Sequence, residues 1–226
     1  MNPLPRPQLE PSALARRYEQ VRAQSLALAE PLSEADAQVQ SMPDVSPTKW
    51  HLAHVTWFFE TFVLERHERE FKPFHPRFRV LFNSYYNQVG EQHPRAQRGL
   101  VSRPSLAEVK AYRAQVDQRM AALLAASHDP IIDSLVELGL QHEQQHQELL
   151  LTDIKHVLSC NPLAPMYRGS WPLATVAPLS MAWVEHPGGP VEIGHDGAGF
   201  AFDNESPRHQ QQAKRTTREP ANGPEN

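Results

Sequence analysis

Two histidines four residues apart are the strongest candidates for chemistry in this sequence. They are the first and last residues of the segment HEQQH, His142 and His146. On an α-helix this spacing places both imidazoles on one face, one turn apart, where they can hold one metal ion. The pattern therefore predicts part of a metal site on a helix.

The apolar residues around this segment indicate which way the imidazoles face. Each residue of a helix advances by about 100°. At that step His142 and His146 fall near the middle of an arc of apolar residues, namely Ile131, Leu135, Leu149, Leu150 and Val157. We therefore expect both imidazoles to point into the protein interior. Asp153 lies on the same arc, and a carboxylate there could orient a ligand imidazole by a hydrogen bond.

Two other interpretations of this segment are open. H-E-x-x-H on a helix is typical of zinc metalloproteases, with Glu143 as general base and a third ligand downstream. The sequence continues QELLLTD, without the glycine and histidine of the metzincin extension, and Glu143 falls toward the solvated edge of the arc. This disfavours a zinc metalloprotease. The other interpretation is a pair of core histidines, hydrogen-bonded to the backbone or to Asp153, with no metal.

A third ligand is best sought in the segment KWHLAHVTWFFE, which contains His51 and His54. These two histidines share one side of a strongly apolar helix. The polar stripe of that helix runs along the other side, through Lys49, Thr56, Glu60 and His67. Spacing does not choose between His51 and His54. A three-histidine site with open coordination positions suits catalytic zinc or non-haem iron(II), and spacing does not distinguish these metals.

Four predicted helices position these residues. Their starts carry proline, serine or aspartate, and their approximate ranges are residues 11–30, 46–68, 102–126 and 129–160. Ser46 is expected to cap the second helix, with Pro47 at its first position. A long connection, residues 71–104, is rich in Phe, Tyr and Arg, which favours a packed, functional loop. Four helices with one long crossover predict a mainly α protein built on a four-helix bundle.

The character of the sequence changes after Cys160. We expect a helical metal-binding domain over residues 1–165 and a proline-rich linker over 166–180. Short strands joined by Gly-rich turns are expected over 181–209, as the start of a β-rich domain that is incomplete. Residues 210–226 are polar and predicted to be disordered. The strands would then leave unpaired edges.

Composition narrows the class of protein. The 226 residues are 40% hydrophobic and carry a net charge of -4, which suits a globular protein and gives no reason to expect nucleic acid or an acidic membrane as partner. No apolar run is long enough for a membrane span, and the N-terminal MNPLPRPQLEP is too polar for a signal peptide. The only cysteine is Cys160, which favours a reducing cytoplasm. Composition does not predict an oligomeric state.

Three separated segments, in order, resemble one known family. SPTKWHLAHVTWFFETFVL, YYNQVGEQHPRAQRG and HEQQHQELLLTDIKH are similar to the N-terminal DinB-like domain of ergothioneine biosynthesis (EgtB-type) sulfoxide synthases. GGPVEIGHDGAGFAFDNESPRH resembles a truncated start of their second, formylglycine-generating-enzyme-like domain. The resemblance runs from about Pro11 to His209, and it implies a DinB-like four-helix bundle.

The resemblance also implies a reaction and a ligand set. Members of the family use mononuclear non-haem iron(II) and O₂ to join the sulfur of cysteine or γ-glutamylcysteine to the imidazole of hercynine, giving a sulfoxide. The family pattern implies that His54, His142 and His146 bind Fe(2+). His51 then becomes a helix-core residue or one that supports a ligand.

Three further residues match substrate-binding positions of the family. Gln145 corresponds to the residue whose amide faces the hercynine imidazole. Arg95 and Arg98 match basic residues that meet the carboxylates of the thiol substrate, a task that suits the planar guanidinium fork. The alternative for all three is a solvated polar side chain.

The sequence departs from the family pattern in its second domain. In the family that domain supplies a catalytic tyrosine, and this sequence ends shortly after the segment that resembles its start. We therefore assign no catalytic tyrosine and expect metal binding without normal turnover. One alternative is a DinB-like, metal-dependent thiol transferase, which needs no second domain. The other is a non-catalytic helical remnant whose buried histidines stabilise the bundle.

Overall fold

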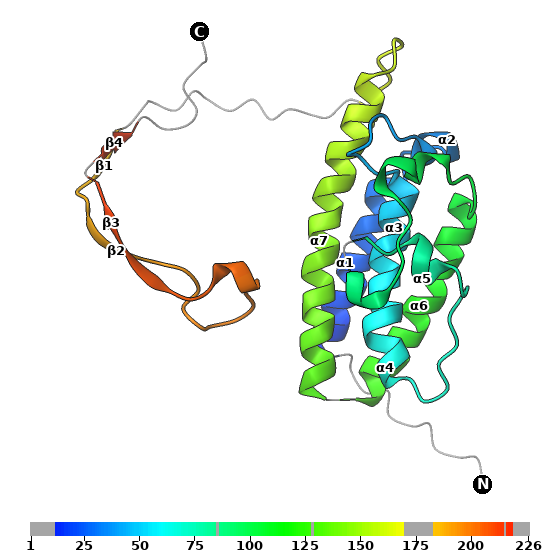
Figure 1. Ribbon diagram of the computed structural model, residues 1–226, viewed down its shortest axis with the longest axis horizontal. Helices are drawn as coiled ribbons and strands as arrows, with labels where there is room; N and C mark the ends of the chain where they lie inside the picture. Colours follow the sequence, from blue (N-terminus) through cyan, green and yellow to red (C-terminus); the bar gives the residue numbers. More distant parts are fainter. Residues whose placement is uncertain (1–11, 85, 128, 170–182, 215, 219–226) are drawn as a thin grey trace. The chain divides into compact units, whose positions relative to one another are not determined.

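The computed structural model describes residues 12–84, 86–127, 129–169, 183–214 and 216–218. The chain divides into two compact units, Met1–Gly169 and Ser170–Asn226. The first unit is helical, and the strands lie in the second (Figure 1). The prediction of a mainly α protein with a short β segment is confirmed.

Four long helices build the first unit, and they are α1 (Ala13–Ala29), α3 (Thr48–Phe58), α6 (Leu106–Ala126) and α7 (Pro130–Ser159). α3 continues through a π-helical segment, η1 (Phe59–Leu64), into the short α4 (Glu65–His67). In Figure 1, α1 and α7 run in one direction, and α3 and α6 run in the other. The long connection therefore crosses over between two parallel helices, as the four-helix bundle predicted from the sequence requires.

Side-chain caps define most of the helix starts. The hydroxyl of Ser12 accepts a hydrogen bond from the backbone of Ala15 at the start of α1. Ser105 and Glu108 form a reciprocal capping box at the start of α6. At α7 the cap is Asp129, and Pro130 takes the first helical position. The predicted starts of these three helices are therefore close to the observed ones.

The start of α3 differs from the prediction. Pro47 precedes the helix, and no side chain caps it. Ser46 is engaged elsewhere, because its backbone N–H donates to Asp153 Oδ2 at 2.8 Å and its hydroxyl accepts from Arg98 at 2.8 Å. Ser46 therefore joins the start of α3 to α7 and to the crossover connection, and it is not a helix cap.

The crossover connection is packed against the bundle. It contains the short helix α5 (Phe78–Leu81) and the 3-10 segments η2 (Asn87–Val89) and η3 (Arg95–Leu100). Phe78 and Phe82 are buried in the hydrophobic core. Asn83 is also buried, and its amide donates to the backbone carbonyls of Tyr86, Gly90 and Glu91. The expectation of a packed loop is confirmed. A further short helix, α2 (Glu34–Gln38), was not predicted.

Gly139 sets how closely α3 and η1 approach α7. A Cβ at this position would lie 2.6 Å from Cε1 of Phe59 and 2.9 Å from Cε1 of Phe58. Both rings are buried, and Phe58 also lies against His142, with ring centroids 5.0 Å apart. The missing side chain thus lets two aromatic rings contact α7 one turn before the first of its candidate ligands.

The second unit is a pair of two-stranded antiparallel sheets. β2 (Gly189–Ile193) pairs with β3 (His209–Ala213), with Gly189 opposite Ala213, and β1 (Val184–His186) pairs with β4 (Thr216–Arg218). The short 3-10 segment η4 (Asp203–Glu205) lies between β2 and β3. The side chains of β2 and β3 are mostly exposed.

The prediction of a disordered stretch from residue 210 is corrected over the described part. Gln210–Ala213 and Thr216–Arg218 instead form strands, because their backbone groups pair with the strands that open this unit. Each strand still has only one neighbour in the part of the chain that the structure describes. Residues 219–226 of the predicted tail and 170–180 of the predicted linker lie outside the described residues.

The first unit extends beyond the predicted boundary at residue 165. The hydroxyl of Tyr167 donates to the carbonyl of Leu28, and Arg168 donates to the carbonyl of Ala27 at 2.8 Å. These contacts fold the segment after α7 back onto α1. Within the described ranges, no helix is both long and apolar enough to cross a membrane.

Candidate metal centre

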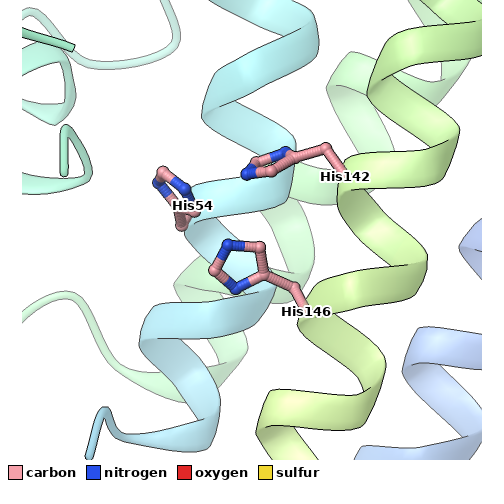
Figure 2. Close-up of side chains that lie close together, drawn as sticks. All are labelled: His54, His142 and His146. Carbon is pink, nitrogen blue, oxygen red and sulfur yellow. The ribbon is translucent and has the colours of Figure 1, made fainter. Parts of the chain in front are cut away.

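Three imidazoles converge on one point between α3 and α7 (Figure 2). His54 comes from α3, and His142 and His146 come from α7. Their ligating nitrogens all lie within 4.8 Å of one another. Nitrogens bound to one ion at about 2.1 Å lie within about 4.2 Å of one another, so a small movement of the rings would close the set around a metal.

His54 is the most firmly held of the three. It is 1% exposed, and its Nδ1 lies 2.6 Å from the carbonyl oxygen of Phe82. Since a carbonyl oxygen only accepts, Nδ1 carries the hydrogen, and the lone pair is on Nε2. The rings of Trp50 and Trp57 stack on the imidazole, with centroids 4.5 and 5.5 Å away. His54 therefore presents one nitrogen in one orientation.

The two histidines of α7 are partly exposed. Nδ1 of His142 is buried and has no hydrogen-bond partner among the residues that the structure describes. A buried nitrogen without a partner is unfavourable, by about 1–3 kcal/mol. Such an atom beside two other converging imidazoles fits a group of side chains that serves to bind an ion.

All three imidazoles are neutral at pH 7. Burial lowers the pKa of His142 to about 4. Burial, together with the neighbouring histidines and Arg98, lowers the pKa of His54 and of His146 well below the usual range. A metal binds the neutral ring, so protons do not compete for these nitrogens near neutrality. The donor set fits a divalent transition metal.

The glutamate of the HEQQH segment has a different environment from the one predicted. Glu143 is fully buried, whereas Ile131 and Leu149, which were assigned to the apolar arc, are 64% and 44% exposed. The buried arc of α7 contains Ile132, Val136, Gly139, Leu140, Glu143, Leu150, Asp153 and Ile154. His142 and His146 lie at its edge. The predicted arc was therefore wrong only in part. Leu150 and Asp153 are buried as expected, but a paired carboxylate occupies a buried position that a hydrophobic pattern assigns to solvent.

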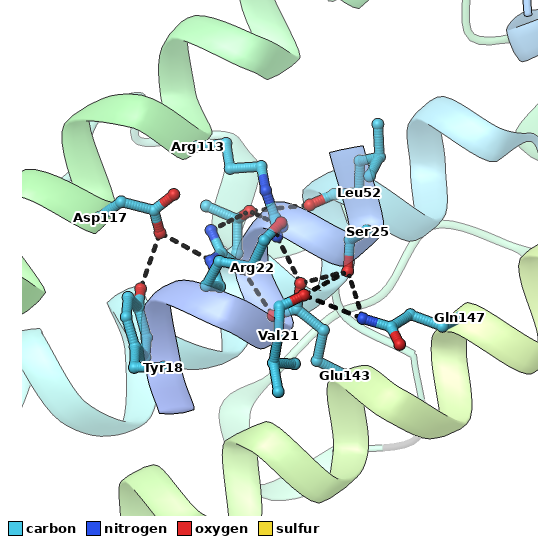
Figure 3. A network of polar contacts seen from close by, with 10 residues as sticks. Tyr18, Val21, Arg22, Ser25, Leu52, Arg113, Asp117, Glu143 and Gln147 are labelled. Atoms are coloured by element: carbon cyan, nitrogen blue, oxygen red, sulfur yellow. Dashed lines mark hydrogen bonds and ion pairs between the residues drawn. The ribbon is translucent and has the colours of Figure 1, made fainter. Parts of the chain in front are cut away.

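Glu143 lies in a network of polar side chains from all four long helices (Figure 3). Arg113 donates to its Oε1, Arg22 donates to Oε2 at 2.9 Å, and the Ser25 hydroxyl donates to Oε1 at 2.6 Å. Burial by itself would raise the pKa of Glu143, but the two guanidiniums and the hydroxyl lower it to about 2. Such a carboxylate is a poor general base. The geometry therefore also disfavours a metalloprotease.

The supporting residues predicted behind the ligands lie in contact with one another. His51 Nε2 is 2.9 Å from Asp153 Oδ2, and His51 Nδ1 is 2.9 Å from Nδ1 of His146. Asp153 therefore reaches a candidate ligand through His51. Spacing alone did not choose between His51 and His54. The structure places His54 in the converging group, and His51 contacts that group through His146.

The predicted substrate-binding residues are spread over two elements. Gln145 is exposed on α7. Arg95 is exposed and donates to the carbonyl of Asp44. Arg98 is 4% exposed and lies over the ring of Trp50, 3.4 Å from its centroid. The roles of these three residues toward a substrate stay predictions.

Three aromatic neighbours of the site were not predicted from the sequence, namely Trp50, Trp57 and Phe58. Each lies three or four residues from His54 along α3, and this spacing is the signal that could have identified them. Trp50 separates the imidazole of His54 from the guanidinium of Arg98. Phe58 packs on His142.

Comparison with protein families gives the class of this bundle. The family model of the DinB superfamily matches residues 17–150, which include all three converging histidines. The chain belongs to the DinB superfamily. A comparison with the curated proteins found no match. The matched region ends within α7 of the DinB domain and does not include the strands.

A small cavity lies beside His146, one of the three histidines. It has a volume of about 10 Å³ and is lined by Ser25, His51, Leu52, Val55, Glu143, His146, Gln147 and Leu150. That volume accommodates at most one water molecule. His142 and His146 are partly exposed next to the exposed Gln145. His54 is buried, so a small molecule would have to approach the site on the side of His142 and His146.

Proposed function

We propose that this DinB domain binds iron(II) through His54, His142 and His146 and serves O₂-dependent C–S bond formation. The substrates would be hercynine and either cysteine or γ-glutamylcysteine. The observation that carries the proposal is the convergence of three imidazoles, one of them fixed by a backbone carbonyl. The choice of iron and of these substrates rests on the resemblance of three segments to EgtB-type sulfoxide synthases. A cytoplasmic setting belongs to the same proposal.

The overall reaction is balanced. An imidazole C–H, a thiol S–H and O₂ give a C–S bond, an S=O group and one water molecule. Bound iron(II) would supply the electron transfer to O₂ that this oxidation of sulfur requires. Three protein ligands leave coordination positions for other groups, which suits such chemistry.

The side chains of the DinB domain would orient the substrates. Gln145 is exposed and directly precedes the partly exposed His146 on α7. Its amide can donate to one imidazole nitrogen of hercynine or accept from the other. Arg95, on the surface, would meet a carboxylate of the thiol substrate, and Arg98 would contribute charge from behind Trp50.

A second candidate function is metal-dependent transfer of a low-molecular-weight thiol to an electrophile. The observation in its favour is that the superfamily match includes the complete three-histidine group and none of the strands. Zinc would suit that reaction, because it can bind and activate a thiolate without redox chemistry. In both functions the same three residues hold the metal.

Hercynine binding separates these functions. The chain would be loaded with iron(II) without oxygen and titrated with hercynine in a calorimeter, next to Gln145→Leu and a matched control at an exposed neighbour, Gln144→Leu. We expect saturable binding by the wild type and the control, and a loss of about 10-fold or more in Gln145→Leu, whose side chain cannot hydrogen-bond. No hercynine binding, together with zinc-dependent thiol conjugation, would favour the transferase. If the chain showed neither hercynine binding nor thiol conjugation, the result would indicate a non-catalytic bundle.

A further inference from the structure

We infer that Asp153 determines which nitrogen of His146 faces the metal, and that it does so through His51. The inference rests on the metal-binding function proposed above. Asp153 and His51 are 8% and 3% exposed, so their contact is shielded from water. Oδ2 of Asp153 lies 2.8 Å from the backbone nitrogen of Ser46 and 2.9 Å from Nε2 of His51. The backbone N–H can only donate, so this oxygen is an acceptor.

The positions of the hydrogens follow from this acceptor. Nε2 of His51 must carry a hydrogen, since a lone pair facing Oδ2 at 2.9 Å would be repelled. A buried, neutral imidazole carries one hydrogen, and in His51, which is 3% exposed, that hydrogen is on Nε2, so its Nδ1 has a lone pair. Nδ1 of His146, 2.9 Å away, must then be the donor. The lone pair of His146 is therefore on Nε2.

The orientation of His146 agrees with this assignment. In Figure 2 one ring nitrogen of His146 points toward His54 and His142, and the other points away from them. The opposite tautomer would place an N–H at the point where the three rings converge and would exclude a metal from that nitrogen. Asp153 thus acts as a positioning residue for a ligand that it does not touch.

Two ligands of the same site are oriented by different means. The backbone carbonyl of Phe82 orients His54, and no substitution at Phe82 removes a carbonyl. A side-chain carboxylate, relayed by a second imidazole, orients His146. Partners behind metal ligands typically change metal affinity by about 10–100-fold when they are removed. The relay should therefore be sensitive to substitution at residue 153.

A purely structural role for Asp153 is the competing explanation. Asp153 joins α7 to the start of α3 through Ser46 and His51, and this connection alone would stabilise the bundle. A structural role predicts lower stability in a variant but no preference for one tautomer of His146. The two explanations therefore differ in what they predict for the ring nitrogens.

The first test needs no metal and no variant. Two-bond ¹H–¹⁵N correlation spectra of the metal-free chain distinguish Nδ1–H from Nε2–H imidazoles. We expect Nε2–H for His51 and Nδ1–H for His146. The reverse pair of tautomers, or an equal mixture at His146, would overturn the inference even if every variant failed to fold.

The second test uses Co(II) as a spectroscopic probe of the site. We expect Asp153→Ala to raise the Kd for Co(II) by about 10–100-fold and to change the visible spectrum. Asp153→Asn should restore most of the affinity, because its amide oxygen can still accept from Ser46 and His51. The control is Glu60→Gln, which alters another buried carboxylate, bonded to Phe74 and Tyr112.

Each outcome of the Co(II) test has a distinct meaning. Unchanged affinity and spectrum in Asp153→Ala would overturn the relay alone. Equal weakening by Asp153→Ala and Glu60→Gln would also overturn it, since the effect would then come from stability. No Co(II) binding by the wild type would overturn the metal-binding function, and the relay with it.

Discussion

Glu143 and Arg22 form an ion pair at 2.9 Å in the centre of the bundle, with both side chains almost completely buried. The pair joins α7 to α1 one residue after the first candidate ligand of α7. Asp117 of α6 and Thr56 of α3 also accept hydrogen bonds from Arg22, at 2.6 and 3.0 Å. The acidic residue of a sequence that resembles a protease motif is therefore a structural residue of the helical core.

This relationship predicts the effect of Glu143→Gln. The variant removes a carboxylate that Arg22 and Arg113 share, so Arg113 loses its ion-pair partner and Arg22 keeps only Asp117. Removal of one partner of a buried ion pair is strongly destabilising, by about 3–5 kcal/mol. We expect a loss of this size in the free energy of unfolding, measured by urea denaturation. Metal content of the folded fraction should be unchanged.

Glu137→Gln is the matched control for this prediction. Glu137 lies on the same helix and pairs with Arg17, but both side chains are partly exposed. Exposed ion pairs contribute about 0–1 kcal/mol, so the control should lose little stability. Equal losses in the two variants would show that burial of the Glu143 pair has no special effect.

Gly139→Ala should destabilise the bundle although alanine favours helices. The gain in helix propensity is about 1 kcal/mol. The new Cβ would meet the buried rings of Phe58 and Phe59 at under 3 Å, and overpacking of a core typically costs about 1–3 kcal/mol. We expect a lower Tm for Gly139→Ala and almost no change for the exposed control Gln144→Ala. A higher Tm for Gly139→Ala would contradict the close approach of α3 and α7.

The strands of the second unit should exchange their amide hydrogens much faster than α7. An isolated two-stranded sheet is at best marginally stable in water, and the side chains of β2 and β3 are mostly exposed. Hydrogen–deuterium exchange with mass spectrometry would compare peptides from residues 189–213 with peptides from residues 136–154. Equal protection of the two regions would mean that the strands are covered by something beyond their own pairing.

Local signals in the sequence were sufficient to predict the four long helices. Ser105, Asp129 and Pro130 each have a defined effect on a helix start, and the structure confirms them. Ser46 failed as a predicted cap because Asp153 and Arg98, far away in the sequence, bind its backbone and its hydroxyl. Contacts of that kind leave no local pattern.

The candidate site was only partly predictable, because some of its contacts also come from residues that are far away in the sequence. Histidine spacing and the resemblance led to the three converging residues. The burial of Glu143 was missed, because the guanidiniums that neutralise it come from Arg22 on α1 and Arg113 on α6. A periodic pattern along one helix contains no information about charges that other helices provide.

Iron content of the chain purified without oxygen tests the central claim most directly. It should be measured for the wild type, His54→Ala and His51→Ala at high protein concentration. The proposal predicts about one iron per wild-type chain, its loss in His54→Ala, and its retention, with weaker affinity, in His51→Ala. No stoichiometric metal in the wild type, or loss in His51→Ala with retention in His54→Ala, would contradict the three-histidine site.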